Sequence, residues 1–144
     1  MPLTVTPRHP ALGAEVRGID MRKPMDPTTV RAVRDAWTRH LVLIFPDQPI
    51  TDQEHVAFTR QFGEPEIFHQ TSLHLRSDDV KEIFLVSNVD ARNRIVMPSD
   101  PGQKQLNSSR QWHTDSSYKT LPSIGSLLHG IEISRTGGIT QFIN

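Results

Sequence analysis

The chain has 144 residues, with 16 basic and 16 acidic side chains, so its formal net charge at pH 7 is zero. Without a basic excess we expect no nucleic-acid binding, and no apolar run approaches the ~18 residues needed to span a membrane. The absence of cysteine excludes disulfides and thiolate metal sites, and the N-terminal residues do not have the pattern of a signal peptide, so we expect a cytoplasmic protein.

Two helices are predicted in the first half of the chain. Asp26 followed by Pro27 is typical of a helix start, and Val30, Val33 and Trp37 then recur at helical spacing, which predicts an amphipathic helix over 27–40. The apolar run 41–45, closed by a proline, predicts a strand that is buried on both faces.

The second helix starts at Thr51, which forms a capping-box pattern with Glu54. Phe58 and Phe62 lie one turn apart on its predicted buried side, and Gly63 is the expected C-cap. The mixture of helices with later strands predicts an α+β protein.

The second half of the chain reads as short strands joined by long polar segments. Residues 64–80 have no apolar period, and residues 90–110 are rich in turn-forming and polar side chains. Loops of this length in a compact domain are usually functional or disordered. Strands are predicted at 83–86, 123–133 and 139–143, with a turn at Gly137-Gly138.

A His-x-Asp pair follows the longer of these loops. In an extended segment the side chains of His113 and Asp115 project to the same face, while Thr114 points away. An imidazole and a carboxylate side by side form two legs of the two-His-one-carboxylate triad that holds non-haem Fe(II). The pair alone is a weak motif, because a surface histidine beside an aspartate is common.

The longer string Trp112–Tyr118 resembles the metal-binding signature of the taurine/2,4-dichlorophenoxyacetate dioxygenase (TauD/TfdA) family. Further segments resemble family blocks in the family's order: His9–Asp20 its opening strands, 41–48 its first core strand and turn, and 58–64 the end of its second helix. Gly137–Thr140 resembles its Gly-Gly-Asp-Thr motif, with Ile139 in place of the aspartate.

This resemblance implies a fold and a reaction. The fold is α+β but mainly β, a double-stranded β-helix (jelly roll) core with flanking helices. The reaction is Fe(II)- and 2-oxoglutarate-dependent oxygenation. One atom of O2 goes into succinate as 2-oxoglutarate is decarboxylated with release of carbon dioxide, and the other hydroxylates a small organic acid of the aryloxyalkanoate or alkylsulfonate type. Residues 1–144 are expected to be the N-terminal part of one such domain, truncated, so that the core is incomplete.

The resemblance also implies roles for particular residues. His113 and Asp115 are the expected catalytic metal ligands, and Thr140 is the expected hydrogen-bond donor to a carboxylate of 2-oxoglutarate. The third iron ligand and an arginine that pairs with the co-substrate are not expected within this chain. Substrate contacts are expected among polar residues near the ligands and in the loops, namely Tyr118, Ser116, Arg110, Asn107 and His74, with His69 and Ser109 as weaker candidates.

Two other functions stay open. A catalytically incomplete jelly-roll fragment would bind metal weakly through two ligands and turn nothing over. A sugar- or peptide-binding β-sandwich module would bind no metal at all. The composition also leaves a homo-oligomer open.

Overall fold

The structure is a computed structural model that describes residues 2–67, 80–89, 92, 94–97, 99 and 111–144. By its internal contacts the chain divides into two units, one made of Met1–Glu64 with Leu128–Asn144 and the other of Pro65–Leu127. All of the helices and strands assigned in the described residues lie in the first unit.

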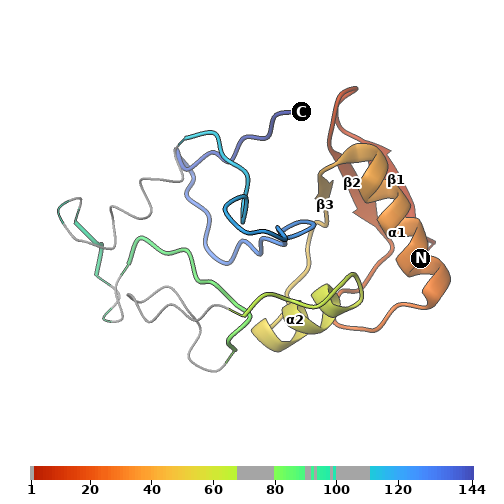
Figure 1. The fold of residues 1–144 in the computed structure, drawn as a ribbon, viewed down its shortest axis with the longest axis horizontal. Coiled ribbons are helices and arrows are strands. Elements are labelled where there is room, and N and C mark those ends of the chain that lie inside the picture. The colour runs from red at the N-terminus through yellow and green to blue at the C-terminus, as the bar shows by residue number, and fades with distance from the viewer. Residues whose placement is uncertain (1, 68–79, 90–91, 93, 98, 100–110) are drawn as a thin grey trace. The chain divides into compact units, whose positions relative to one another are not determined.

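A small three-stranded sheet forms near the N-terminus (Figure 1). Strand β1 (Thr4–Pro7) pairs antiparallel with β2 (Ala14–Arg17), and Val5 lies opposite Val16. Strand β3 (Leu43–Ile44) pairs parallel with the other edge of β2, so the order is β1-β2-β3. The central position of β2 buries its first three residues.

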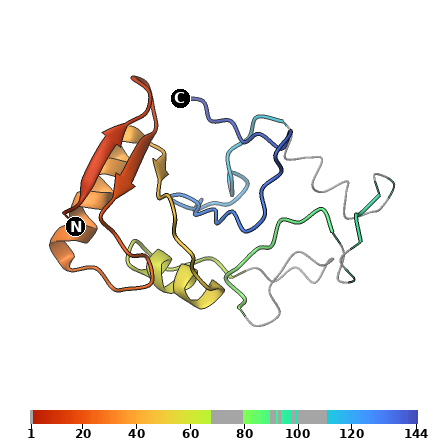
Figure 2. The ribbon, with the colours of Figure 1, turned by 180° about the vertical axis from the view of Figure 1, so that it is seen from behind.

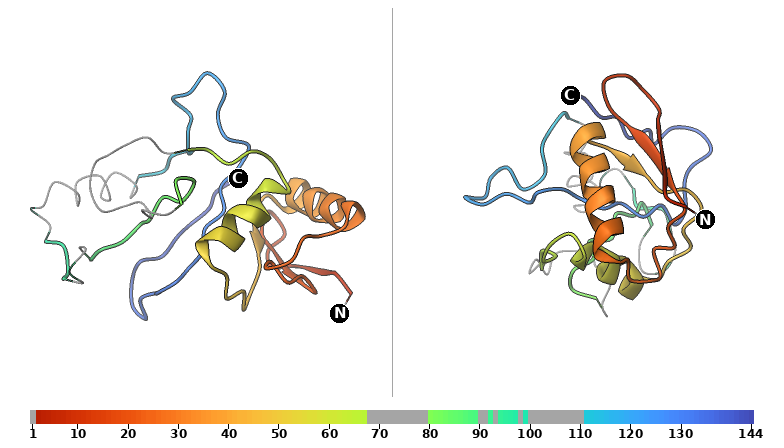
Figure 3. Two further views of the ribbon diagram at one scale, coloured as in Figure 1. Left: turned by 90° about the horizontal axis from the view of Figure 1, so that it is seen from below. Right: turned by 90° about the vertical axis from the view of Figure 1, so that its right-hand side faces the viewer.

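Helix α1 (Pro27–His40) has the predicted bounds. The Asp26 side chain accepts hydrogen bonds from the backbone N–H groups of Thr28 and Thr29, which satisfies donors that a helix start otherwise leaves free. Val33 and Ala36 are its buried residues. The helix covers one face of the sheet, as the views from behind and from the side show (Figures 2 and 3).

The prediction of a strand over 41–45 that is buried on both faces is wrong. Leu41 ends helix α1 as its C-cap in a left-handed conformation (φ 65°), and only Leu43 and Ile44 pair as a strand. In the described part of the sheet β2 is the sole neighbour of β3, so β3 is an edge strand. Ile44 is therefore 47% exposed.

Helix α2 (Asp52–Arg60) begins with the predicted capping box, in which the Thr51 and Glu54 side chains each bond the other's backbone N–H. Phe58 is buried, with its ring centroid 5.3 Å from that of Phe62 and 5.7 Å from that of Phe45. The C-cap of helix α2 is Gln61, in right-handed helical conformation, and not the predicted Gly63.

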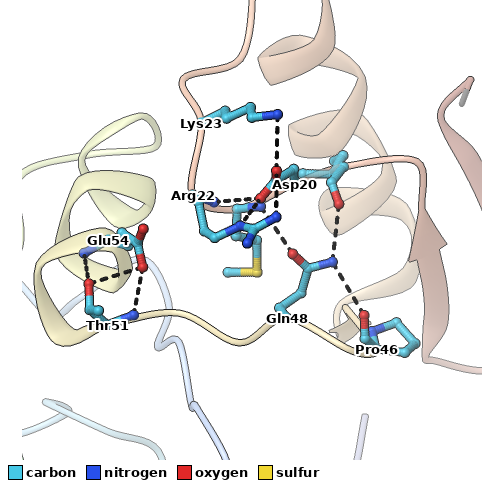
Figure 4. A network of polar contacts seen from close by, with 9 residues as sticks. Asp20, Arg22, Lys23, Pro46, Gln48, Thr51 and Glu54 are labelled. Atoms are coloured by element: carbon cyan, nitrogen blue, oxygen red, sulfur yellow. Dashed lines mark hydrogen bonds and ion pairs between the residues drawn. The ribbon is translucent and has the colours of Figure 1, made fainter.

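Gln48 ties together the segments that follow β2 and β3 (Figure 4). Its side-chain Oε1 accepts from the Met21 N–H at 3.0 Å, and Nε2 donates to the carbonyls of Ile19 at 3.1 Å and Pro46 at 3.3 Å. Beside it Asp20 binds Arg22 through two hydrogen bonds, which hold the pKa of the Asp20 carboxyl well below its ordinary value.

The strands predicted at 83–86, 123–133 and 139–143 do not form in the described residues, where Phe84 is a single bridge residue and Val89 forms an isolated antiparallel bridge with Ile95. Figure 1 accordingly shows 111–144 without an arrow or a helix. A strand needs a neighbour that bonds its backbone N–H and C=O groups. The segments 123–133 and 139–143 have the composition of strands but no ladder partner in the described residues, and most of their apolar side chains are exposed.

In its coarse form the α+β prediction is confirmed by two helices and a three-stranded sheet in the described residues. The described helices have 14 and 9 residues and the strands 4, 4 and 2, so a strand-dominated core is not formed by this part of the chain. Among the described helices, none is long and apolar enough to cross a membrane.

Candidate metal centre

The predicted pair of ligands lies side by side. His113 Nε2 is 3.4 Å from Asp115 Oδ1. Two ligand atoms about 2.1 Å from one metal ion and at right angles to each other are about 3.0 Å apart. The observed separation is therefore close to the one that a single ion bound by both groups requires.

The backbone of Gln111 sets the tautomer of His113. His113 Nδ1 lies 2.7 Å from the Gln111 carbonyl oxygen. A carbonyl can only accept a hydrogen bond, so Nδ1 carries the proton and the neutral ring keeps its lone pair on Nε2. The ring nitrogen that faces Asp115 is thus the one able to bind a metal, and the bond to Nδ1 is the usual partner of a metal-ligating histidine.

The other carboxylate oxygen of Asp115 has its own partner. Ser126 Oγ donates a hydrogen bond to Asp115 Oδ2 at 2.8 Å. This contact leaves Oδ1 directed at His113 and holds the carboxylate plane. Sequence reasoning did not find Ser126, because it lies 11 positions beyond the ligand in a segment that the pattern predicted to be a strand.

A turn follows His113 and begins at Asp115. Residues 115–118 form a turn in which the Lys119 N–H donates to the Ser116 carbonyl at 3.0 Å. Ser116 has φ 55°, in the left-handed region that side chains other than glycine rarely adopt. The turn begins at Asp115, after the His113–Thr114 segment for which extended geometry was predicted, and the predicted consequence, a His113 side chain next to Asp115, is observed.

Glu66 contacts this turn and was also missed. Its carboxylate pairs with the Lys119 ammonium group and accepts from Ser116 Oγ at 3.3 Å and Ser123 Oγ at 3.2 Å. Ser123 Oγ also lies 2.9 Å from Ser116 Oγ, so Glu66 and Ser116 share the one hydrogen of the Ser123 hydroxyl group as acceptors. The Lys119 hydrogen bond, above the other contacts, lowers the pKa of the Glu66 carboxyl. No local sequence signal links Glu66 to a turn 50 residues away.

The donor set fits part of an iron site. A neutral imidazole nitrogen and a carboxylate oxygen are the donors of the two-His-one-carboxylate triad. In the part of the chain that the structure describes, no cluster of three or more His, Cys, Asp or Glu side chains could hold a metal ion. His113 and Asp115 are 49% and 61% exposed at their side chains, so these two ligands face outward from the unit that carries them.

The remaining predicted residues divide into three groups. Tyr118 lies in the ligand turn and is 84% exposed. Thr140 belongs to the first unit, where it is exposed and outside any strand, and the preceding Gly137 and Gly138 have φ values of 77° and 66°. That conformation fits the turn predicted for the two glycines. His69, His74, Asn107, Ser109 and Arg110 lie outside the described residues.

Comparison with known proteins decides the family. Residues 4–144 match the family described as taurine catabolism dioxygenase TauD, TfdA family. The chain belongs to this family. The resemblance inferred from the ligand string and the ordered blocks is thereby confirmed over almost the whole chain.

Two curated relatives show how much of a family member the chain represents. It is 29% identical over 144 residues to the alpha-ketoglutarate-dependent 2,4-dichlorophenoxyacetate dioxygenase of Cupriavidus pinatubonensis, covering 99% of the chain and 50% of the relative. It is 31% identical over 143 residues to the alpha-ketoglutarate-dependent sulfate ester dioxygenase of Pseudomonas putida, covering 99% and 42%. The chain therefore spans half the length of these relatives or less.

A solved structure supports the fold. The crystal structure of AAD-2 in complex with Mn(II) and N-oxalylglycine superposes with a TM-score of 0.67, at 24% identity, over 85% of this chain and 39% of that one. This likeness places the backbone of the chain within that fold.

Proposed function

We propose that residues 1–144 are the N-terminal part of a single jelly-roll domain of an Fe(II)- and 2-oxoglutarate-dependent dioxygenase. The observation that carries this proposal is the 3.4 Å approach of His113 Nε2 to Asp115 Oδ1, with the tautomer set by a backbone carbonyl. Membership of a dioxygenase family supports the same reaction class and the same cofactors, Fe(II) and 2-oxoglutarate. The double-stranded β-helix core would be completed by residues outside this chain.

His113 and Asp115 would hold the iron, which supplies open coordination positions for 2-oxoglutarate and O2. Thr140 would donate its hydroxyl hydrogen to a carboxylate of 2-oxoglutarate. Its side chain is exposed, so the hydroxyl group is accessible. Ile139 cannot supply the polar contact of the aspartate that the family motif has at this position. The third ligand and the arginine for the co-substrate would come from a later part of the protein.

The substrate would be a small organic acid of the aryloxyalkanoate or alkylsulfonate type. The names of the two relatives, which act on 2,4-dichlorophenoxyacetate and on sulfate esters, support a substrate with one anionic end. Arg110 would pair with that anion through its planar guanidinium group. Contacts from Tyr118, Ser116, Asn107 and His74 would complete the substrate pocket.

The remaining predictions concern surroundings. The protein would bind no nucleic acid and no membrane, would act in the cytoplasm, and would meet 2-oxoglutarate, O2 and the organic acid as its small-molecule partners. A homo-oligomer is compatible with the exposed apolar side chains of the second half of the chain.

One observation favours the alternative, a catalytically incomplete fragment. Two ligands, not three, come together in the described residues. In that case the 144-residue polypeptide would bind a divalent metal ion weakly and would not convert 2-oxoglutarate.

A single experiment tests the reaction. Protein expressed from the complete reading frame is purified without oxygen, loaded with Fe(II) and given 2-oxoglutarate, with small carboxylates, sulfonates and sulfate esters screened as substrates. Substrate-dependent succinate release that is lost in His113→Ala supports the proposal. If the protein binds no Fe(II) and releases no succinate with any of these substrates, the result would instead support a non-catalytic binding module.

A further inference from the structure

Glu66 lies outside the ligand pair, yet it contacts two segments that follow Asp115 in the chain. Its carboxylate binds Lys119 and Ser116 from the ligand turn and Ser123 from the segment that follows. The Glu66 and Lys119 side chains are 27% and 36% exposed, so both are more covered than the ligands that they adjoin. An ion pair in this setting is less screened than one on the open surface.

The serines that Glu66 contacts are close in sequence to Asp115 or to the residue that binds it. Ser116 is the next residue in the chain, and Ser126, which donates to Asp115 Oδ2, follows Ser123 by three positions. A single carboxylate therefore joins the residue after the ligand to the segment that orients the ligand.

The backbone of Ser116 explains why such a tie is needed. Its φ of 55° is unfavourable for a residue with a Cβ atom, and such conformations persist only where the surroundings hold them. The surroundings here are the bonds from Ser116 Oγ to Glu66 and from Ser123 Oγ to Ser116 Oγ. Without these side-chain bonds, the Lys119 N–H bond to the Ser116 carbonyl is left to hold the turn. The backbone of Ser116 can then relax, which redirects the Asp115 side chain that precedes it.

We propose that Glu66 is a positioning residue for the metal site, which holds the 115–119 turn so that Asp115 Oδ1 stays directed at His113 Nε2. Glu66 itself touches neither the metal nor the substrate. This inference rests on the proposed function, because it takes His113 and Asp115 as metal ligands.

Substitution of Lys119 distinguishes this positioning role from a simple electrostatic effect of the Glu66 charge. A negative Glu66 near a cation site would favour metal binding from a distance, and Lys119 would then oppose it. Under that explanation Lys119→Met strengthens metal binding. If Glu66 acts by holding the turn, Lys119→Met weakens binding, because it removes one of the contacts through which the carboxylate holds it.

The test measures the dissociation constant of Mn(II) alone, by electron paramagnetic resonance of the free ion, in protein from the complete reading frame. Glu66→Gln and Lys119→Met are each expected to weaken Mn(II) binding about tenfold, the lower end of the effect of removing an outer partner of a metal ligand. The double variant should bind Mn(II) no more weakly than the single variant with the lower affinity, since the two substitutions break the same contact between Glu66 and Lys119.

Glu64→Gln is the matched control. It removes the same charge two positions earlier, from a side chain that is 84% exposed and 4.0 Å from Arg60, and it should leave Mn(II) binding unchanged. Thermal melting of every variant shows whether a change in affinity is separate from a loss of folding. If Glu66→Gln does not fold, Lys119→Met and Ser123→Ala carry the test.

The outcomes distinguish the inference from the function on which it depends. Tighter or unchanged binding in Lys119→Met overturns the positioning role, as does an equal loss in Glu64→Gln and Glu66→Gln. If His113→Ala binds Mn(II) as well as the parent protein, the metal site itself is wrong and the proposed function fails. Loss in His113→Ala, Glu66→Gln and Lys119→Met, with Glu64→Gln normal, supports both.

Discussion

At the scale of single residues, the two proposed metal ligands, His113 and Asp115, are held by different kinds of partner. The His113 ring bonds the backbone carbonyl of Gln111. A substitution at Gln111 keeps this carbonyl unless it also changes the backbone conformation. Asp115 depends on the Ser126 hydroxyl, which a single substitution deletes. The carboxylate is therefore the ligand whose orientation is more easily disturbed by change elsewhere in the chain.

The first prediction follows from the ligand pair. His113→Ala or Asp115→Ala, in protein from the complete reading frame, should abolish succinate release, because each removes one of few metal donors. Gln111→Ala is the control and should be close to normal, since it keeps the carbonyl that sets the His113 tautomer. Normal turnover with tight metal binding in His113→Ala would disprove the ligand assignment.

The second prediction concerns Thr140. Replacement by valine keeps the shape but removes the hydroxyl donor proposed for the 2-oxoglutarate carboxylate. A hydrogen bond to a charged group contributes ~1.5–3 kcal/mol, so 2-oxoglutarate should bind ~10–100-fold more weakly in a direct titration. Thr140→Ser, which keeps the hydroxyl, should bind almost normally. An unchanged Kd in Thr140→Val would make Thr140 a structural residue.

At the scale of elements, the helices and the sheet are stabilised in different ways. Helix α2 carries its start signal within four residues, where Thr51 and Glu54 cap each other. The sheet is joined to the segments around it by Gln48, which is bonded to Met21, 27 positions earlier in the chain. Loss of one such side chain should therefore affect the arrangement of several segments at once.

The third prediction tests this junction. Gln48→Met keeps length but leaves the Met21 N–H and the Ile19 carbonyl without this partner. The free energy of unfolding should fall by ~1–3 kcal/mol, the cost of an unsatisfied and partly buried polar group. Gln53→Met on the exposed side of α2 should change it little. Urea denaturation of protein from the complete reading frame gives both values, and equal stabilities would refute the role of Gln48.

At the scale of the whole molecule, apolar side chains are distributed unevenly along the chain. The buried hydrophobic residues come from the sheet, the two helices, Met21 and Val80. The described residues after 111 instead contain many large apolar side chains that are more than half exposed, including Leu121, Ile133 and Ile139. Apolar surface of this extent favours association.

The fourth prediction concerns the 144-residue polypeptide by itself. It should form oligomers or aggregates in sedimentation velocity, and it should release no succinate from 2-oxoglutarate with Fe(II), because only two metal ligands come together in its described residues. Ile133→Lys should reduce association, whereas Thr136→Lys, which adds the same charge at an exposed polar position, should not. A monomer that melts cooperatively and releases succinate would contradict both expectations.

Local patterns account for the features that the sequence alone predicted well. Asp26 and Thr51 bond N–H groups two or three residues away, so the starts of α1 and α2 follow from neighbours in the chain. The pairing of His113 with Asp115 is likewise a relation between residues two positions apart. The two helix starts therefore depend little on the rest of the fold, whereas the direction of the Asp115 carboxylate also depends on Ser126, 11 positions away.

The tertiary structure decided what depends on distant partners. Within the apolar run 41–45, only Leu43 and Ile44 form a strand, and it is an edge strand because β2 is its one described neighbour. The segments 123–133 and 139–143 did not become strands because no described segment pairs with them. Glu66 contacts the segment of the ligand turn through an ion pair with Lys119, 53 positions away in the chain. Composition shows that a segment can form a strand or an ion pair, but a backbone ladder or an ion pair forms only when the fold supplies the opposite group.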